Sequence, residues 1–357
     1  TRQARRYPEA YLRTILALLA GLAAVTTIGP VAAKDPSRPF VPGFQTDFPD
    51  AAILRDGAAF FAYATNAQGD MANVQVARSS DLVRWELVRN GDRLHDAMPV
   101  MPPWANRGKT WAPEVIRTSV GYVLHFTAHD RKSDLQCLGA AFSTSPLGPF
   151  VSNATEPLVC QTELGGTIDS HPFRDDDGQL YLYYKSDANN PRFGKKTDIF
   201  VQKLSADGLA VEGQPVALLR NDTAWEAHVI EAPTMVRRGQ GYVLFFSANH
   251  FGWENHQRLS PYAIGYARCS GPLGPCRDAT ENPIVHSYND RKAGCLSGPG
   301  HQSVFSVGGR QFLSFHAWAA TKGCRRADSA RYLYIAPLLW EGDTPRLGIS
   351  LRAAPRR

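Results

Sequence analysis

The sequence predicts an all-β fold, a five-bladed β-propeller. Strand-like runs rich in Tyr, Phe, Val and Leu recur at roughly 60-residue intervals, and a fixed period of this length is typical of propeller blades. Most of the runs follow a glycine within a few residues, which favours a turn before each strand. The five runs are residues 60–65, 122–128, 180–186, 242–248 and 312–318.

A second repeated element supports the same fold. A short strand ending in a turn occurs at residues 77–85, 141–150 and 267–276, and the last two copies share the string Pro-Leu-Gly-Pro. Residues 203–209 form a weaker copy. Five copies of the repeat fill the chain without a linker, so residues 34–357 are expected to form a single domain. A β-sandwich with irregular strand spacing is the alternative fold.

The first 33 residues have the composition of a signal peptide. Arg2, Arg5, Arg6 and Arg13 precede an apolar stretch at residues 14–33, which ends in small residues suited to cleavage. We therefore expect export and a secreted, extracellular protein. The apolar stretch is nearly long enough to span a bilayer, so an uncleaved membrane anchor is the alternative.

Cysteine content and charge agree with export. The chain has six Cys, an even number, and their spacing matches no zinc motif. Pairing of sequence neighbours gives 137–160, 269–276 and 295–324, one of fifteen possible connectivities.

The net charge is +6, of which four Arg and one Glu in the first 33 residues contribute +3. The remaining Lys and Arg are scattered, so no nucleic-acid partner is expected.

Polar residues recur at the start of each expected blade, next to the channel. They are Asp50, Glu114 within Trp-Ala-Pro-Glu, Asp169, Glu231 within Val-Ile-Glu-Ala-Pro, and His301. We expect them to share one structural register, because independent turn or cap residues would not follow the period of the blades. Burial in its apolar string would raise the pKa of Glu231, as a general acid requires. Two carboxylates on either side of a sugar are the minimum for glycoside hydrolysis.

These strings, in this order, resemble those of family 43 of the glycoside hydrolases, five-bladed propellers that include β-xylosidases, α-L-arabinofuranosidases and arabinanases. The similar segments cover nearly the whole mature chain and recur in each of the five blades. They are Phe-Pro-Asp at 48–50, Trp-Ala-Pro-Glu at 111–114, Ile-Asp at 168–169, Glu-Ala-Pro at 231–233 and Gly-Pro-Gly-His at 298–301.

The resemblance implies an inverting mechanism and a role for each carboxylate. Asp50 would be the general base, Glu231 the general acid, and Asp169 the residue that orients Glu231 and raises its pKa. Substrate-binding roles are expected for three further residues. They are Trp111, which could stack on a sugar, Arg331, which could bind a hydroxyl, and His301, which could also help to hold a calcium ion.

The expected substrate is a plant polysaccharide or oligosaccharide, cleaved by an exo-acting α-L-arabinofuranosidase or β-xylosidase. The alternatives are an endo-1,5-α-L-arabinanase, a carbohydrate-binding propeller without catalysis, and a retaining hydrolase of fructan or sucrose. The usual Arg-Asp-Pro acid segment of that last group is absent from the sequence. No cofactor is required for the chemistry, although a structural calcium is possible, and a monomer is expected.

Overall fold

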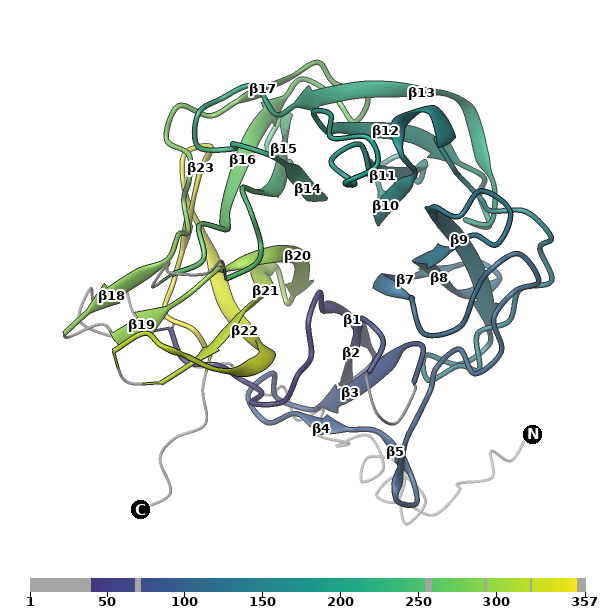
Figure 1. Cartoon of the computed structure of the whole chain (residues 1–357), viewed down its shortest axis with the longest axis horizontal. Helices are drawn as coiled ribbons and strands as arrows, with labels where there is room; N and C mark the ends of the chain where they lie inside the picture. Colours follow the sequence, from purple (N-terminus) through teal and green to yellow (C-terminus); the bar gives the residue numbers. More distant parts are fainter. Residues whose placement is uncertain (1–39, 68–71, 254–258, 292–293, 322, 352–357) are drawn as a thin grey trace, which may run out of the picture. The chain divides into compact units, whose positions relative to one another are not determined.

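Five antiparallel sheets stand around one axis in the computed structural model (Figure 1). The structure describes residues 40–67, 72–253, 259–291, 294–321 and 323–351, which all belong to one compact unit, Ala33–Arg357. The expected signal peptide at residues 1–33 lies outside the described residues. The prediction of an all-β, five-bladed propeller is confirmed.

Each sheet is one blade, and its strands follow chain order from the axis outwards. The first blade contains β1 (Ala52–Asp56), β2 (Ala59–Ala64), β3 (Gln75–Ser79) and β4 (Glu86–Leu87). The second contains β7 (Trp111–Thr118), β8 (Gly121–His129) and β9 (Gln136–Ser143). The third contains β10 (Thr167–Arg174), β11 (Leu180–Ser186), β12 (Asp198–Leu204) and β13 (Val211–Arg220).

The last two blades have four strands each. The fourth blade contains β14 (Ile230–Arg238), β15 (Gly241–Ala248), β16 (Ala263–Cys269) and β17 (Cys276–Asp278). The fifth contains β20 (Gly300–Val307), β21 (Arg310–Ala320), β22 (Arg326–Glu341) and β23 (Thr344–Leu347). The runs that the sequence predicted are the second strands of the blades, so each blade begins with the strand before them.

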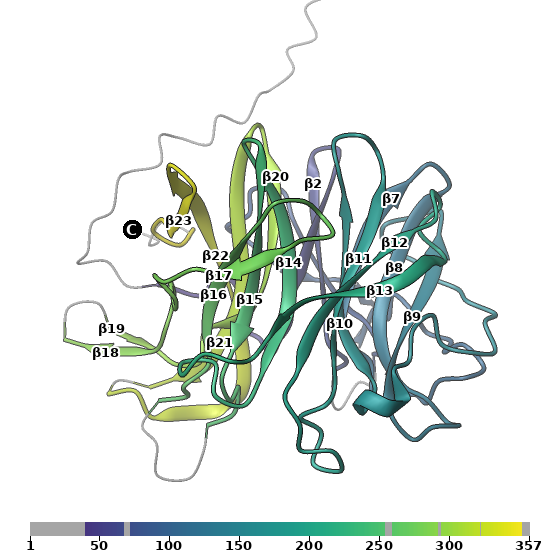
Figure 2. The ribbon, with the colours of Figure 1, turned by 90° about the horizontal axis from the view of Figure 1, so that it is seen from above.

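Two small hairpins and one 3-10 helix lie between the blades. They are β5 (Arg89–Asn90) with β6 (Arg93–Leu94), β18 (Tyr288–Asp290) with β19 (Gly294–Leu296), and η2 (Thr162–Leu164). In the side view, β18 and β19 project from the flank of the ring (Figure 2). No helix among the described residues is long and apolar enough to cross a membrane.

The first strands β1, β7, β10, β14 and β20 contact one another in sequence around the axis, and β20 contacts β1 to close the ring. The segment before β1 strengthens this closure. Gly43 N–H donates to the carbonyl of Leu333 in β22 at 2.9 Å, and Phe48 N–H donates to that of Arg331 at 3.0 Å. The two ends of the described chain are therefore joined through the fifth blade.

The repeated Pro-Leu-Gly-Pro string has a structural reason. Buried tyrosines on the second strands of the first and third blades donate hydrogen bonds to the next blade along the chain. The hydroxyl of Tyr63 donates to the carbonyl of Pro146, and that of Tyr183 donates to the carbonyl of Pro272, both at 2.6 Å. The two prolines open the two copies of the string, so the string supplies an equivalent contact between successive blades in both places.

All six cysteines form disulfides, and the pairing of sequence neighbours is confirmed: Cys137–Cys160, Cys269–Cys276 and Cys295–Cys324. The first ties β9 to the segment that leads into the third blade. The second joins β16 to the edge strand β17, and the third joins β19 to the turn before β22. Each bridge therefore fastens an outer part of a blade.

Candidate active site

The same backbone irregularity occurs at the start of every blade. In blades two to five the pairing of the first strand shifts over two residues, which marks a β-bulge. A residue with positive φ lies at this place in each blade, and the corresponding residue in the first blade lies two residues before the start of β1. The five residues and their φ angles are Asp50 (59°), Ala112 (44°), Asp169 (58°), Ala232 (51°) and His301 (49°). Such strain in residues other than glycine concentrates at functional sites.

Each bulge residue has an N–H that the sheet does not satisfy, and all five find an acceptor on the neighbouring blade. In four cases the acceptor belongs to the second strand of that blade or, in the first blade, directly follows it. The four bonds are Ala112 N–H to Thr65 Oγ1 (3.0 Å), Asp169 to Thr127 Oγ1 (3.2 Å), His301 to Ser247 Oγ (2.8 Å) and Asp50 to His316 Nδ1 (3.2 Å).

The third blade is the exception. Its corresponding residue is Lys185, paired with Ile168 as Thr127 is paired with Trp111. An ammonium cannot accept a hydrogen bond. The N–H of Ala232 instead donates to Asp169 Oδ2 at 3.0 Å.

Glu231 precedes the bulge residue of the fourth blade, and both of its carboxylate oxygens are bound. Oε1 accepts a hydrogen bond from the hydroxyl of Tyr262 at 2.6 Å, and Oε2 accepts one from Lys185 Nζ at 3.2 Å. Lys185 is 1% exposed and also donates to Asn189 at 2.8 Å. A Cβ on Gly300 would overlap the ring of Tyr262, so this glycine makes the approach of Tyr262 possible.

The expectation of a raised pKa for Glu231 is wrong. Burial does raise the pKa of Glu231, but the charge of Lys185 and the hydrogen bond from Tyr262 outweigh burial and lower it. Lys185 belongs to the third blade, so its contact with Glu231 depends on the packing between blades. Asp169 shows the opposite balance: burial raises its pKa, and the neighbouring charge of Glu231 adds to the effect, to about 6. The pair therefore holds one proton, mainly on Asp169, in mildly acidic conditions.

Asp50 is surrounded by positive charge and hydrogen-bond donors. Its Oδ2 accepts a hydrogen bond from the Thr65 hydroxyl at 2.6 Å, and its Oδ1 accepts one from Arg331 Nη1 at 3.1 Å. The Nδ1 atoms of His316 and His301 lie 3.0 and 3.5 Å from the same Oδ1. Burial would raise the pKa of Asp50, but Arg331 and the two histidines outweigh it and hold the pKa well below its usual range. Asp50 is therefore ionised at neutral pH.

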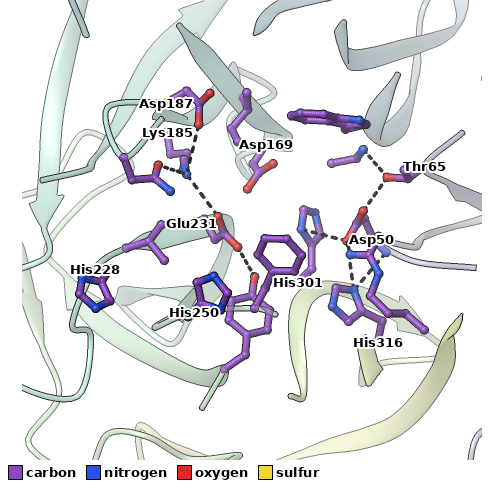
Figure 3. A pocket seen from close by; sticks show the side chains of 18 of the residues that line it. Asp50, Thr65, Asp169, Lys185, Asp187, His228, Glu231, His250, His301 and His316 are labelled. Atoms are coloured by element: carbon purple, nitrogen blue, oxygen red, sulfur yellow. Dashed lines mark hydrogen bonds and ion pairs between the residues drawn. The ribbon is translucent and has the colours of Figure 1, made fainter. Parts of the chain in front are cut away.

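These groups line one cavity of about 710 Å³, within the range of small-molecule sites (Figure 3). All six site residues expected from the sequence line it: Asp50, Trp111, Asp169, Glu231, His301 and Arg331. Trp111 is 37% exposed, an unusual degree for an indole. It lies between this cavity and a second one of about 580 Å³, which Trp111, Thr65 and Arg331 also line.

Sequence reasoning placed two residues in the wrong register and missed others. Glu231 lies one residue before the register of Asp50 and Asp169, which Ala232 occupies in its blade, but it still lines the cavity. Glu114 lies two residues after that register, which Ala112 occupies in its blade. Its Oε2 lies 2.8 Å from His171 Nδ1 instead, and it is not among the residues that line the cavity. Lys185 and Tyr262 were missed, although Lys185 was visible as a lone cation ending the apolar run Leu-Tyr-Leu-Tyr-Tyr.

The expected metal-binding role of His301 has little support in the geometry. His301 belongs to no group of three His, Cys, Asp or Glu ligand atoms close enough to share one ion; within the described ranges, only Asp222, Glu226 and Asp278 form such a group. The charges of Asp50 and Glu231 are already opposed by Arg331 and Lys185. The acid–base groups around the cavity are all side chains of this chain, so the chemistry that they support needs no cofactor.

Comparisons with known proteins agree with the arrangement. The family model described as glycosyl hydrolases family 43 matches residues 37–345. The chain is 27% identical to a β-D-galactofuranosidase of Aspergillus niger, over 77% of this chain and 74% of the relative. It is 24% identical to an extracellular exo-α-(1→5)-L-arabinofuranosidase of Cellvibrio japonicus, over 84% and 85%.

Solved structures show the same fold. The crystal structure of a thermostable family-43 glycoside hydrolase superimposes with a TM-score of 0.72 at 30% identity, covering 87% of this chain and 96% of the other. This protein therefore belongs to family 43 of the glycosyl hydrolases and is a glycoside hydrolase.

Proposed function

We propose that this glycoside hydrolase is an inverting, exo-acting enzyme that releases single sugars from plant cell-wall polysaccharide or oligosaccharide, as an α-L-arabinofuranosidase or a β-xylosidase. The observation that best supports this is the contrast between carboxyl groups around one cavity. Asp50 is held ionised, while the pair of Asp169 and Glu231 retains a proton. An inverting glycosidase needs one carboxylate to activate water and one carboxylic acid to protonate the leaving oxygen.

In this proposal Asp50 is the general base. Arg331 fixes its Oδ1 and Thr65 fixes its Oδ2, so the carboxylate is oriented before substrate arrives. Pre-orientation reduces the reorganisation that the reaction requires. Water bound to Asp50 would attack the anomeric carbon and give up its proton to this carboxylate.

Glu231 is the proposed general acid, and Asp169 is its partner. Ionised Glu231 and ionised Asp169 repel each other, so their pair keeps one proton that neither group alone would keep at the same pH. Tyr262 and Lys185 fix the Glu231 carboxyl in the cavity. Glu231 passes the shared proton to the departing oxygen, and the pair then regains a proton from solvent.

Three residues are proposed to bind the sugar. The exposed indole of Trp111 offers a flat apolar face for a sugar ring. Arg331 and His301 lie beside Asp50 and offer N–H donors to sugar hydroxyls. Because Trp111 and Arg331 also line the second cavity, the part of the substrate beyond the cleaved bond could extend there.

Two other substrate classes have specific support. An extracellular endo-α-(1→5)-L-arabinanase of Bacillus subtilis is 22% identical over 83% of this chain, which favours an endo-acting arabinanase as the second candidate. The Aspergillus relative favours a β-D-galactofuranoside. A screen with the nitrophenyl glycosides of α-L-arabinofuranose, β-D-xylose and β-D-galactofuranose, together with linear arabinan, separates all three.

The proposal expects hydrolysis of the arabinofuranoside or the xyloside and monosaccharide as the first product. Asp50→Asn should abolish this activity, and its melting curve should show that the variant is folded. Short arabinan oligomers as first products would make the enzyme endo-acting. Binding of these sugars without any hydrolysis would make the chain a carbohydrate-binding propeller.

We also propose that residues 34–357 act as one secreted, monomeric domain after cleavage of a signal peptide. The basic and apolar composition of residues 1–33 and the three disulfides support export. N-terminal sequencing of protein from the medium should begin near residue 34, and light scattering should give the mass of one chain. Retention of the apolar stretch in a membrane fraction would contradict the proposal.

A further inference from the structure

Three carboxylates meet at the edge of the fourth blade, apart from the residues that line the 710 Å³ cavity. Asp222 and Glu226 belong to the segment between β13 and β14, and Asp278 ends the edge strand β17. One oxygen from each lies within 4.8 Å of the others. The cluster therefore joins two segments that are far apart in the sequence.

Two oxygens of the cluster lack the partners that buried carboxylates require. Glu226 is fully buried; its Oε2 accepts hydrogen bonds from the N–H groups of Asp222 (2.8 Å) and Thr223 (2.9 Å), but its Oε1 has no partner. Asp278 Oδ1 is likewise buried without a partner. A buried polar atom without a partner is costly, and a buried charge without one more so. The two orphaned oxygens indicate that a ligand with positive charge belongs between them.

Among the described residues, no lysine, arginine or histidine forms an ion pair with these three carboxylates. The charged groups that act on Asp278 are Glu226 and Asp222, both negative; together with burial, the largest effect, they raise the pKa of Asp278 to about 7. Several other buried carboxylates are paired with cations, as Asp198 is with Arg220 at 2.7 Å and Asp50 with Arg331 at 3.1 Å.

We propose that Asp222, Glu226 and Asp278 bind a divalent cation of the hard, oxygen-preferring class, with Ca²⁺ the best match. Three carboxylates without His or Cys suit Ca²⁺, which takes oxygen ligands in flexible numbers, better than Zn²⁺. Asp222 is exposed, so water can complete the coordination. The buried hydroxyl of Thr223 is a further oxygen in the same segment.

The cation would brace one wall of the cavity. The segment that carries Asp222 and Glu226 continues to His228 and Val229, which line the cavity, and then enters β14 just before Glu231. The carbonyl of Glu226 already accepts hydrogen bonds from the N–H groups of Val229 and Asn249. A cation that tied this segment to β17 would therefore stabilise the wall without taking part in the reaction.

The test uses the full-length protein, stripped with chelator and titrated with Ca²⁺ or Mg²⁺. One ion should bind per chain by calorimetry, and saturation at 100 times the Kd should raise Tm by roughly 5 °C. Bound Tb³⁺ should show luminescence sensitised by Trp225, next to Glu226 in the chain. Asp278→Asn should abolish the binding and the Tm shift, whereas Asp92→Asn, in an exposed turn, should retain both.

Asp222→Asn provides a second variant, because the exposed position of Asp222 makes misfolding improbable as an explanation; it should weaken binding at least tenfold. Absence of binding to the stripped wild type would overturn the proposal. Wild-type affinity for Ca²⁺ in both variants would also overturn it. So would an Asp278→Asn protein that is more stable than the Ca²⁺-loaded wild type, because that result would mean that the cluster is a protonated carboxyl pair. None of these readouts depends on hydrolysis, so they are independent of the proposed catalytic function.

Discussion

Replacing Lys185 by Met should move the pH dependence of catalysis. The substitution keeps a similar volume but removes the ammonium that contacts the Glu231 carboxylate at 3.2 Å. At an effective dielectric of 20, two unit charges at this separation interact by roughly 5 kcal/mol, and desolvation and the neighbouring Asp187 absorb part of that. Opposite charges this close typically shift a pKa by about 1–3 units.

The direction in which the pH profile moves follows from the positive charge that Lys185→Met removes. Lys185 lowers the pKa of Glu231 and also lowers that of Asp169, so without it the pair keeps its proton to higher pH. If protonation of the pair is required for catalysis, the basic limb of the kcat/KM profile should move up by about 1 unit or more.

Stability should change in a pH-dependent way as well. The depressed pKa of Glu231 in the wild type stabilises the fold above the unfolded pKa, and this contribution is lost as the pH falls through the folded pKa. Removing one partner of a buried ion pair costs about 3–5 kcal/mol. The Tm deficit of Lys185→Met should therefore be large at pH 8 and shrink towards pH 5, where Glu231 can take up a proton.

The matched control is Lys195→Met, which removes a positive charge from an exposed position lining the same cavity. Its basic limb and its Tm should stay close to those of the wild type. An unmoved limb in Lys185→Met, with the fold intact, would refute the link between Lys185 and the proton of the pair. A limb that moves equally in both variants would indicate a general effect of pocket charge.

The other catalytic predictions concern the carboxyl groups themselves. Glu231→Gln should reduce kcat/KM by roughly 10²–10⁴-fold on substrates with poor leaving groups and much less on nitrophenyl glycosides. If Asp169→Asn shows this dependence on the leaving group and Glu231→Gln does not, Asp169 is the acid. Asp169→Asn should move the basic limb to lower pH, because Glu231 alone, beside Lys185, has a lowered pKa; an unmoved limb would separate Asp169 from the acid. Proton NMR of the first-formed sugar, recorded before mutarotation, should show the inverted anomer, and a retained anomer would exclude Asp50 as a base acting through water.

The fold could be predicted from sequence because a propeller repeats its pattern. Each repeat is a small sheet that buries its apolar faces by packing against the next sheet, and a ring of such sheets brings the residues at the start of each blade near the axis. This reasoning brought Asp50, Asp169 and Glu231 to one cavity. The three disulfides were also predicted, because each joins cysteines that are neighbours in the sequence.

What could not be predicted depends on single-residue register and on contacts between blades. Glu114 and Ala112 are two residues apart, and only the bulge decides which one occupies the register of Asp169. The sign of the pKa shift of Glu231 depends on Lys185, which lies 46 residues away in another blade. Burial alone predicts a raised pKa for Glu231, which is the wrong direction, because the contact with Lys185 outweighs burial.

The irregularity of the third blade connects these observations. Four blades supply a neutral acceptor for the N–H of the adjacent bulge, and a hydroxyl or imidazole suffices for that. A lysine at this position in the third blade cannot accept, so the N–H of Ala232 turns to Asp169, while the ammonium turns to Glu231. One exchange of residue type thus orients one carboxylate by a backbone donor and supplies the counter-charge of the other. This geometry gives a further prediction for Lys185. Lys185→Thr should restore the acceptor seen in the other blades and release Asp169 from Ala232. It should therefore alter the pH profile more than Lys185→Met, which removes only the charge. Equal profiles for the two variants would mean that the charge of Lys185 acts alone and that the bond between Ala232 and Asp169 does not depend on it.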